Sequence, residues 1–138
     1  CYTSVYGNTK KAALLLRDEL LSRGCPKVTV NDLARCDMAE AVEDAFRYGK
    51  LVLATTTYNN GIFPFMREFI EELTERGYRN RKIGIIENGS WAPAAAKLIK
   101  KAFEGSKDIV FTDTTVTVNS ALNEKSKEEI SLLAGEIM

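Results

Sequence analysis

The sequence predicts an α/β fold in which a parallel sheet is covered by helices on both faces. Apolar residues recur at helical spacing in five stretches, and short apolar or β-branched runs separate these stretches. A strand, a helix and the next strand form a right-handed crossover, which makes the two strands parallel. The length of 138 residues and the apolar content of 45% suit a single domain over residues 1–138.

The first part of the chain predicts a helix, a strand and a second helix. Residues 8–23 carry leucines at helical spacing, and Gly24 and Pro26 end the pattern. Residues 27–33 alternate and are rich in β-branched side chains, which predicts a short strand. A weaker amphipathic pattern over residues 38–47 predicts the second helix.

The rest of the chain continues this alternation. Residues 50–56 are apolar up to their polar carboxyl end, as expected of a strand buried on both faces of a parallel sheet. Pro64 suits the first turn of a helix over residues 64–76, which Gly77 ends. The remaining expected elements are a strand over 82–87, a helix over 93–103, a strand over 109–118 and a helix over 125–137.

The composition excludes several classes of function. The chain has no histidine, so we expect neither a histidine-activated nucleophile nor a histidine-ligated metal within it. Nineteen basic and nineteen acidic residues give a formal charge of zero, which argues against nucleic acid as a partner. Three cysteines without metal spacing and the absence of a long apolar run predict a soluble cytoplasmic chain that contacts no membrane.

Three loops at the expected carboxyl edge of the sheet carry the candidate site. Ligands of open parallel sheets bind beyond the carboxyl ends of the strands. Residues 3–9, 55–63 and 88–93 follow these ends and are rich in Ser, Thr, Asn, Gly and aromatic residues. The loops at the opposite edge are mostly charged or ordinary, so the asymmetry predicts a binding site formed by these three loops.

The first loop is predicted to hold a phosphate group. It runs directly into the first helix, so its backbone N–H groups and hydroxyls meet at a helix N-terminus. It has neither lysine nor arginine, which suits a phosphate monoester better than a nucleoside triphosphate. Ordinary helix capping by Ser4, Asn8 or Thr9 is the alternative interpretation. The candidate residues of this loop are Ser4, Val5, Tyr6, Gly7, Asn8 and Thr9.

The other two loops are predicted to hold a planar ring. Hydroxyls, amides and an aromatic side chain follow the strand over 50–56, and the one tryptophan of the chain follows the strand over 82–87. A tight Asn-Gly connection and a packed core aromatic are the alternative interpretations. The candidate residues are Thr55, Thr56, Thr57, Tyr58, Asn59, Asn60 and Gly61 in one loop and Asn88, Gly89, Ser90 and Trp91 in the other.

Taken together, the three loops resemble the flavodoxin-like family. Residues 3–9 (Thr-Ser-Val-Tyr-Gly-Asn-Thr) are similar to its FMN-phosphate loop. Residues 57–64 and 89–91 resemble the flavodoxin domain of the flavodiiron proteins, or A-type flavoproteins. The resemblance implies a flavodoxin-like three-layer fold with non-covalently bound FMN, its phosphate on residues 4–9 and its ring between Tyr58 and Trp91. It also implies electron transfer to a redox partner protein or to a linked redox domain with a diiron centre.

The resemblance also bears on what surrounds this chain. Three residues precede the phosphate-binding candidates 4–9, whereas in a flavodoxin a whole strand precedes the corresponding loop, so we expect the chain to be part of a longer polypeptide. A homodimer is an alternative way to bring a flavin next to a second redox centre. A stand-alone flavodoxin, an NAD(P)H-linked flavin or quinone reductase, and a cofactor-free assembly domain are the alternative functions.

Overall fold

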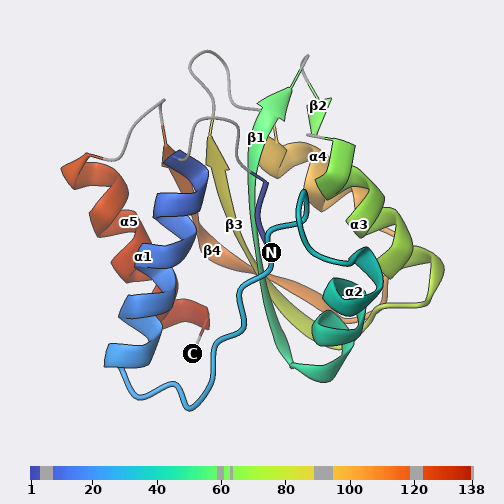
Figure 1. The fold of residues 1–138 in the computed structure, drawn as a ribbon, viewed down its shortest axis with the longest axis horizontal. Coiled ribbons are helices and arrows are strands. Elements are labelled where there is room, and N and C mark those ends of the chain that lie inside the picture. Colours follow the sequence, from blue (N-terminus) through green and yellow to red (C-terminus); the bar gives the residue numbers. More distant parts are fainter. Residues whose placement is uncertain (4–7, 59–60, 63, 89–94, 119–122, 138) are drawn as a thin grey trace.

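A sheet lies between two layers of helices (Figure 1). The computed structural model describes residues 1–3, 8–58, 61–62, 64–88, 95–118 and 123–137. The strands are β1 (Lys50–Tyr58), β2 (Gly61–Ile62), β3 (Arg81–Asn88) and β4 (Ile109–Val118), in the order β2-β1-β3-β4. Because β1, β3 and β4 pair in parallel, the predicted parallel sheet is confirmed.

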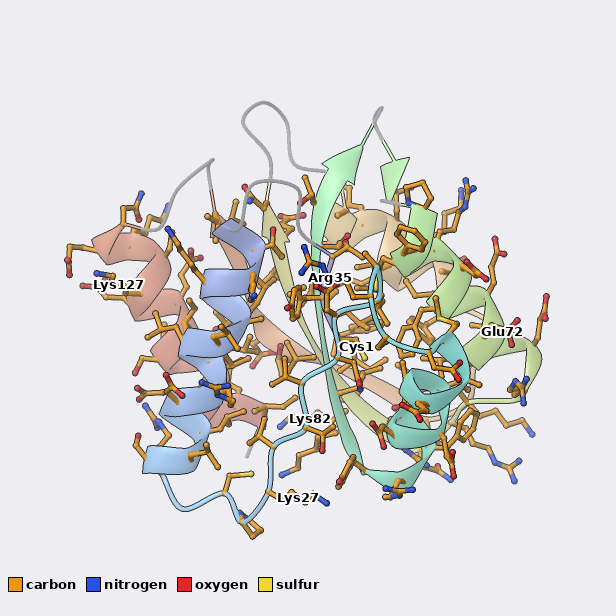
Figure 2. The ribbon with its side chains drawn as sticks, in the orientation of Figure 1. Cys1, Lys27, Arg35, Glu72, Lys82 and Lys127 are labelled. Atoms are coloured by element: carbon orange, nitrogen blue, oxygen red, sulfur yellow. The ribbon has the colours of Figure 1, made fainter. Side chains whose placement is uncertain are left out.

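Helices cover both faces of this sheet, as predicted. One face carries α1 (Asn8–Ser22) and α5 (Glu124–Ile137), and the other carries α2 (Met38–Arg47), α3 (Pro64–Glu75) and α4 (Ala95–Ala102) (Figure 1). Charged side chains such as Glu72 of α3 and Lys127 of α5 point away from the sheet (Figure 2). No helix in the described part of the chain is long and apolar enough to cross a bilayer.

Two apolar cores flank the sheet, because β1 and β3 are buried on both faces. Leu53 of β1 and Ile85 of β3 lie in the core under α2, α3 and α4. Their neighbours Ala54 and Ile86 lie in the core under α1 and α5. This alternation explains why the two strands read as continuous apolar runs in the sequence.

The glycines predicted to end α1 and α3 do so with positive φ angles. The φ angle is 93° at Gly24 and 75° at Gly77, a region that side chains with a Cβ rarely adopt. The N–H of Gly77 donates to the carbonyl of Thr74 at 3.2 Å, and the N–H of Tyr78 donates to the carbonyl of Leu73 at 3.0 Å. These bonds satisfy the last carbonyls of α3 and turn the chain toward β3.

The strand predicted over residues 27–33 is wrong. Within this fully described segment Asp32 alone makes a β-bridge, to Tyr2, and Tyr2 also bridges in parallel to Ala54 of β1. The N–H of Tyr2 donates to the carbonyl of Asn31, and the N–H of Leu33 donates to the carbonyl of Tyr2, both at 3.0 Å. Residues 1–3 therefore lie between this segment and β1, but they offer too few ladder bonds to hold all of residues 27–33 as a strand.

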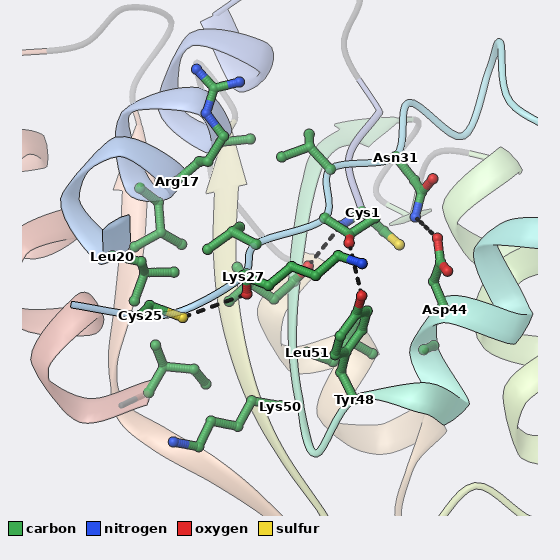
Figure 3. A pocket seen from close by; sticks show the side chains of 18 of the residues that line it. Cys1, Arg17, Leu20, Cys25, Lys27, Asn31, Asp44, Tyr48, Lys50 and Leu51 are labelled. Atoms are coloured by element: carbon green, nitrogen blue, oxygen red, sulfur yellow. Dashed lines mark hydrogen bonds between the residues drawn. The ribbon is translucent and has the colours of Figure 1, made fainter. Parts of the chain in front are cut away.

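A cavity of about 490 Å³ separates residues 27–31 from β1 (Figure 3). Leu20 borders it from α1 and Leu51 borders it from β1. Cys1 lies at one end, where its backbone nitrogen donates to the carbonyl of Val52 at 3.1 Å. This bond holds residue 1 against β1 beside the cavity.

Candidate functional site

The carboxyl edge of the sheet lies at the top of Figure 1. Side chains from α1, β1 and β3 are hydrogen-bonded to one another at this edge. In the parallel register Thr55 lies opposite Glu87, and Thr56 lies opposite Asn88. Successive side chains of a strand point to opposite faces, so the two pairs belong to different faces. The edge therefore has two polar rows, one facing α1 and one facing α4.

The row facing α1 joins three elements through the hydroxyl of Thr9. This residue is completely buried in the first turn of α1. Its Oγ1 lies 3.2 Å from Oγ1 of Thr56 and accepts a hydrogen bond of 3.2 Å from Nδ2 of Asn88. Because buried polar groups need partners, these bonds fix where α1 begins relative to β1 and β3.

The row facing α4 centres on the carboxylate of Glu87, a side chain that is 8% exposed. Oε1 of Glu87 accepts a hydrogen bond from the Thr117 hydroxyl at 3.3 Å, and Oε2 accepts one from the backbone N–H of Ala96 at 2.9 Å. On the neighbouring strand the hydroxyls of Thr55 and Thr3 are hydrogen-bonded at 2.9 Å. Side-chain bonds of this row therefore hold residues 1–3 against β1, and β3 against both β4 and the start of α4.

The electrostatics of the first turn of α1 favour an anion at this edge. Backbone N–H groups at a helix N-terminus carry partial positive charge. The first turn has no acidic residue, and the exposed Lys10 and Lys11 lie within it. The carboxylate of Glu87 lies on the other face of the sheet, where the first turn of α4 donates to it. The α1 side of the edge is therefore the side suited to a phosphate group.

The structure brings together four of the predicted side chains, namely Thr9, Thr55, Thr56 and Asn88. Their polar groups bond to one another or to Thr3, so they form the floor of the candidate site. The backbones of Asn8, Thr57, Tyr58 and Gly61 lie in the elements that end or begin at the same edge. The candidates Ser4, Val5, Tyr6, Gly7, Asn59, Asn60, Gly89, Ser90 and Trp91 lie outside the described residues.

The strand end expected at residue 56 is wrong. β1 continues to Tyr58 and pairs antiparallel with β2, so that Thr57 lies opposite Ile62 and Tyr58 lies opposite Gly61. The β-branched Thr57 and the aromatic Tyr58 favour extended backbone, which explains why the strand runs past its apolar part. The second predicted loop is therefore in large part a short hairpin.

Glu87 and Thr117 are residues of this edge that the sequence analysis does not identify as site residues. The available signal is a single carboxylate at the end of the otherwise apolar stretch from Ile83 to Ile86. A buried strand seldom ends in a carboxylate without a partner for it. That partner, Ala96 of α4, is apparent from the tertiary structure and not from any local pattern.

Comparisons with known proteins identify the family and the fold of this chain. The family model described as flavodoxin matches residues 1–130. An anaerobic nitric oxide reductase flavorubredoxin of Escherichia coli is 26% identical over 96 residues, which are 68% of this chain and 20% of that protein. The chain thus spans about a fifth of the length of the curated relatives that it matches.

Solved structures share the fold. The flavodiiron protein from Giardia intestinalis matches with a TM-score of 0.87 and 19% identity, over 99% of this chain and 34% of that one. A flavodoxin from Streptococcus pneumoniae TIGR4 matches with a TM-score of 0.75 and 20% identity, over 99% of this chain and 93% of that one. These matches confirm the predicted three-layer fold and the resemblance to both groups of proteins.

We expect replacement of Thr9 by valine to lower the free energy of unfolding by about 1–2 kcal/mol. Valine keeps the shape of threonine but removes the buried hydroxyl that bonds to Thr56 and Asn88. Urea unfolding measures the change. The matched control is Thr29→Val at an exposed position, expected to change the free energy by less than about 0.5 kcal/mol. Equal effects of the two substitutions would contradict the role of the Thr9 hydroxyl.

Proposed function

This chain belongs to the flavodoxin family, and from that membership we propose that it binds FMN without a covalent bond and carries electrons through it. The observation that supports this most is the convergence of α1, β1 and β3 on the hydroxyl of Thr9. It brings to one edge the starting points of the three segments that resemble FMN-binding loops. FMN needs a site for its phosphate and a flat site for its ring, and this edge has candidates for both.

The phosphate of FMN would lie at the N-terminus of α1. Residues 4–9 lead into this helix and supply hydroxyl, amide and backbone donors without a basic side chain. Such donors, together with the helix dipole, suit the charge of a phosphate monoester. Thr9 is the member of this loop whose side chain is described, and its bonds to Thr56 and Asn88 hold the end of the loop in place.

The ring of FMN would lie between Tyr58 and Trp91. Thr56 and Asn88 are opposite each other on neighbouring strands, and the two aromatic residues follow them by two and three residues respectively. The chain therefore supplies one aromatic side chain after each of two adjacent strand ends. Aromatic side chains stack well on flat rings, so this spacing supports a ring held between the two.

Bound FMN supplies the redox chemistry of the proposed function, since it accepts and donates electrons. The residues of this chain bind the phosphate, orient the ring and exclude water from one side of it. No side chain is proposed to react, so the site has binding residues and no catalytic residue. A redox partner protein or a linked redox domain would deliver and accept the electrons.

The charge of the chain favours a linked redox domain over a freely diffusing carrier. Equal numbers of basic and acidic residues give no net charge to attract a distant partner. A covalent link keeps the partner close without such attraction. The flavorubredoxin match, of which this chain spans 20%, supports the same arrangement.

We expect Ser4→Ala to weaken FMN binding about tenfold and to leave riboflavin binding nearly unchanged, because FMN alone carries the phosphate. Quenching of flavin fluorescence on titration with the flavin-free protein measures both affinities. The control is Ser22→Ala, at the far end of α1 and exposed. Equal weakening of FMN and riboflavin would contradict the phosphate assignment. Absence of flavin binding by the unchanged protein would favour a cofactor-free assembly domain.

We expect the native polypeptide to be considerably heavier than the 15.4 kDa of this chain, because a linked redox domain would add to it. Mass spectrometry of the protein purified from its source measures this. A native mass close to that of this chain would contradict the linked domain and favour a stand-alone flavodoxin. Rapid reduction of the bound flavin by NAD(P)H without any other protein would favour the flavin or quinone reductase.

A further inference from the structure

We propose that Glu87 is a positioning residue of the cofactor site, an inference that rests on the proposed function. Its buried carboxylate holds together the two ends of the connection over residues 89–94, to which Trp91 belongs. Oε2 of Glu87 accepts from the N–H of Ala96, nine residues further along the chain, at 2.9 Å. This bond connects the end of β3 directly to the first turn of α4.

The hydrogen bond from the N–H of Ala96 to the carboxylate of Glu87 is of a strong type. The first N–H groups of a helix lack partners within the helix, so the backbone N–H of Ala96 is available to donate to Glu87. A carboxylate is the acceptor that such a helix end favours, and charged acceptors form stronger hydrogen bonds than neutral ones. The bond is also shielded from water, because Glu87 is almost completely buried.

Two consecutive side chains fix the point where this connection leaves β3. Glu87 points to the face of α4 and bonds to Ala96 and Thr117. Asn88 points to the face of α1 and donates to Thr9. The end of β3 is thus held from both faces of the sheet, directly before the connection to which Trp91 belongs.

The carboxylate also places a negative charge at the cofactor edge. None of the ion pairs found among the described residues includes Glu87. Its charge is balanced by hydrogen bonds and by the N-terminus of α4, and not by a cation of the described chain. A fixed negative charge disfavours the arrival of electrons nearby, so it lowers the reduction potential of a flavin bound at this edge.

Two substitutions distinguish the effect of the length of the Glu87 side chain from the effect of its charge. Glu87→Asp keeps the charge but is one methylene shorter, so it cannot span the distance to Ala96 without a shift of the backbone. Glu87→Gln keeps the length and an oxygen that accepts from Ala96, but it loses the charge. Glu75→Gln removes a charge at the far end of α3, where the side chain is exposed, and is the matched control.

The test measures flavin affinity, hydrogen exchange and reduction potential in the purified protein. We expect Glu87→Asp to weaken FMN and riboflavin equally, about tenfold, because the ring side of the site is affected and the phosphate side is not. In the flavin-free protein it should speed amide exchange in the peptide that starts α4 and leave the other core peptides unchanged. Glu87→Gln should keep the affinity within about threefold of the unchanged protein and raise the reduction potential, whereas Glu75→Gln should change neither.

Other results would overturn the proposal in distinguishable ways. Unchanged flavin affinity in Glu87→Asp, with normal binding by the unchanged protein, would reject the role of Glu87 alone. Faster exchange throughout the core would show that Glu87 merely stabilises the fold. Absence of flavin binding by the unchanged protein would reject the proposed function together with this inference, and exchange in the flavin-free protein would then still show whether Glu87 anchors α4.

Discussion

The candidate site depends on the parallel pairing of β1, β3 and β4. Parallel strands end at the same edge of a sheet, so the polar residues that follow their apolar parts arrive side by side. The register places Thr55 opposite Glu87 and Glu87 opposite Thr117, with Thr56 opposite Asn88 one residue further on. An antiparallel β3 would carry Asn88 to the opposite edge and leave Thr9 without one of its partners.

The two faces of the sheet hold this edge in different ways. On one face the hydroxyl of Thr9 bonds to Thr56 and Asn88, and on the other the carboxylate of Glu87 bonds to Thr117 and Ala96. These groups are largely buried, so each would be costly without its partner. The two polar rows therefore hold α1 and α4 at fixed positions relative to the sheet, next to the candidate loops.

The sheet is less complete beside residues 27–31, where the cavity lies next to β1. Residues 1–3 connect this region to the site, because Cys1 lines the cavity and Thr3 lies at the other end of this short segment. Tyr2 bridges to Asp32 and Ala54, and the hydroxyl of its neighbour Thr3 bonds to Thr55. A disturbance of the Cys1 end of the sheet would therefore reach the polar row that faces α4.

The sequence by itself determined the helices, the buried strands and the edge of the sheet at which the candidate site lies. Their signals are local: helical spacing, continuous apolar runs, and glycines such as Gly77 at helix ends. It also indicated Thr9, Thr55, Thr56 and Asn88, because polar residues after buried strands are informative in themselves. The tertiary structure alone decided that residues 27–33 do not form a strand, that β1 continues into a hairpin, and that Glu87 bonds to Ala96. Each of these depends on which backbone or side-chain groups lie opposite one another after folding, and no local pattern of residues contains that information.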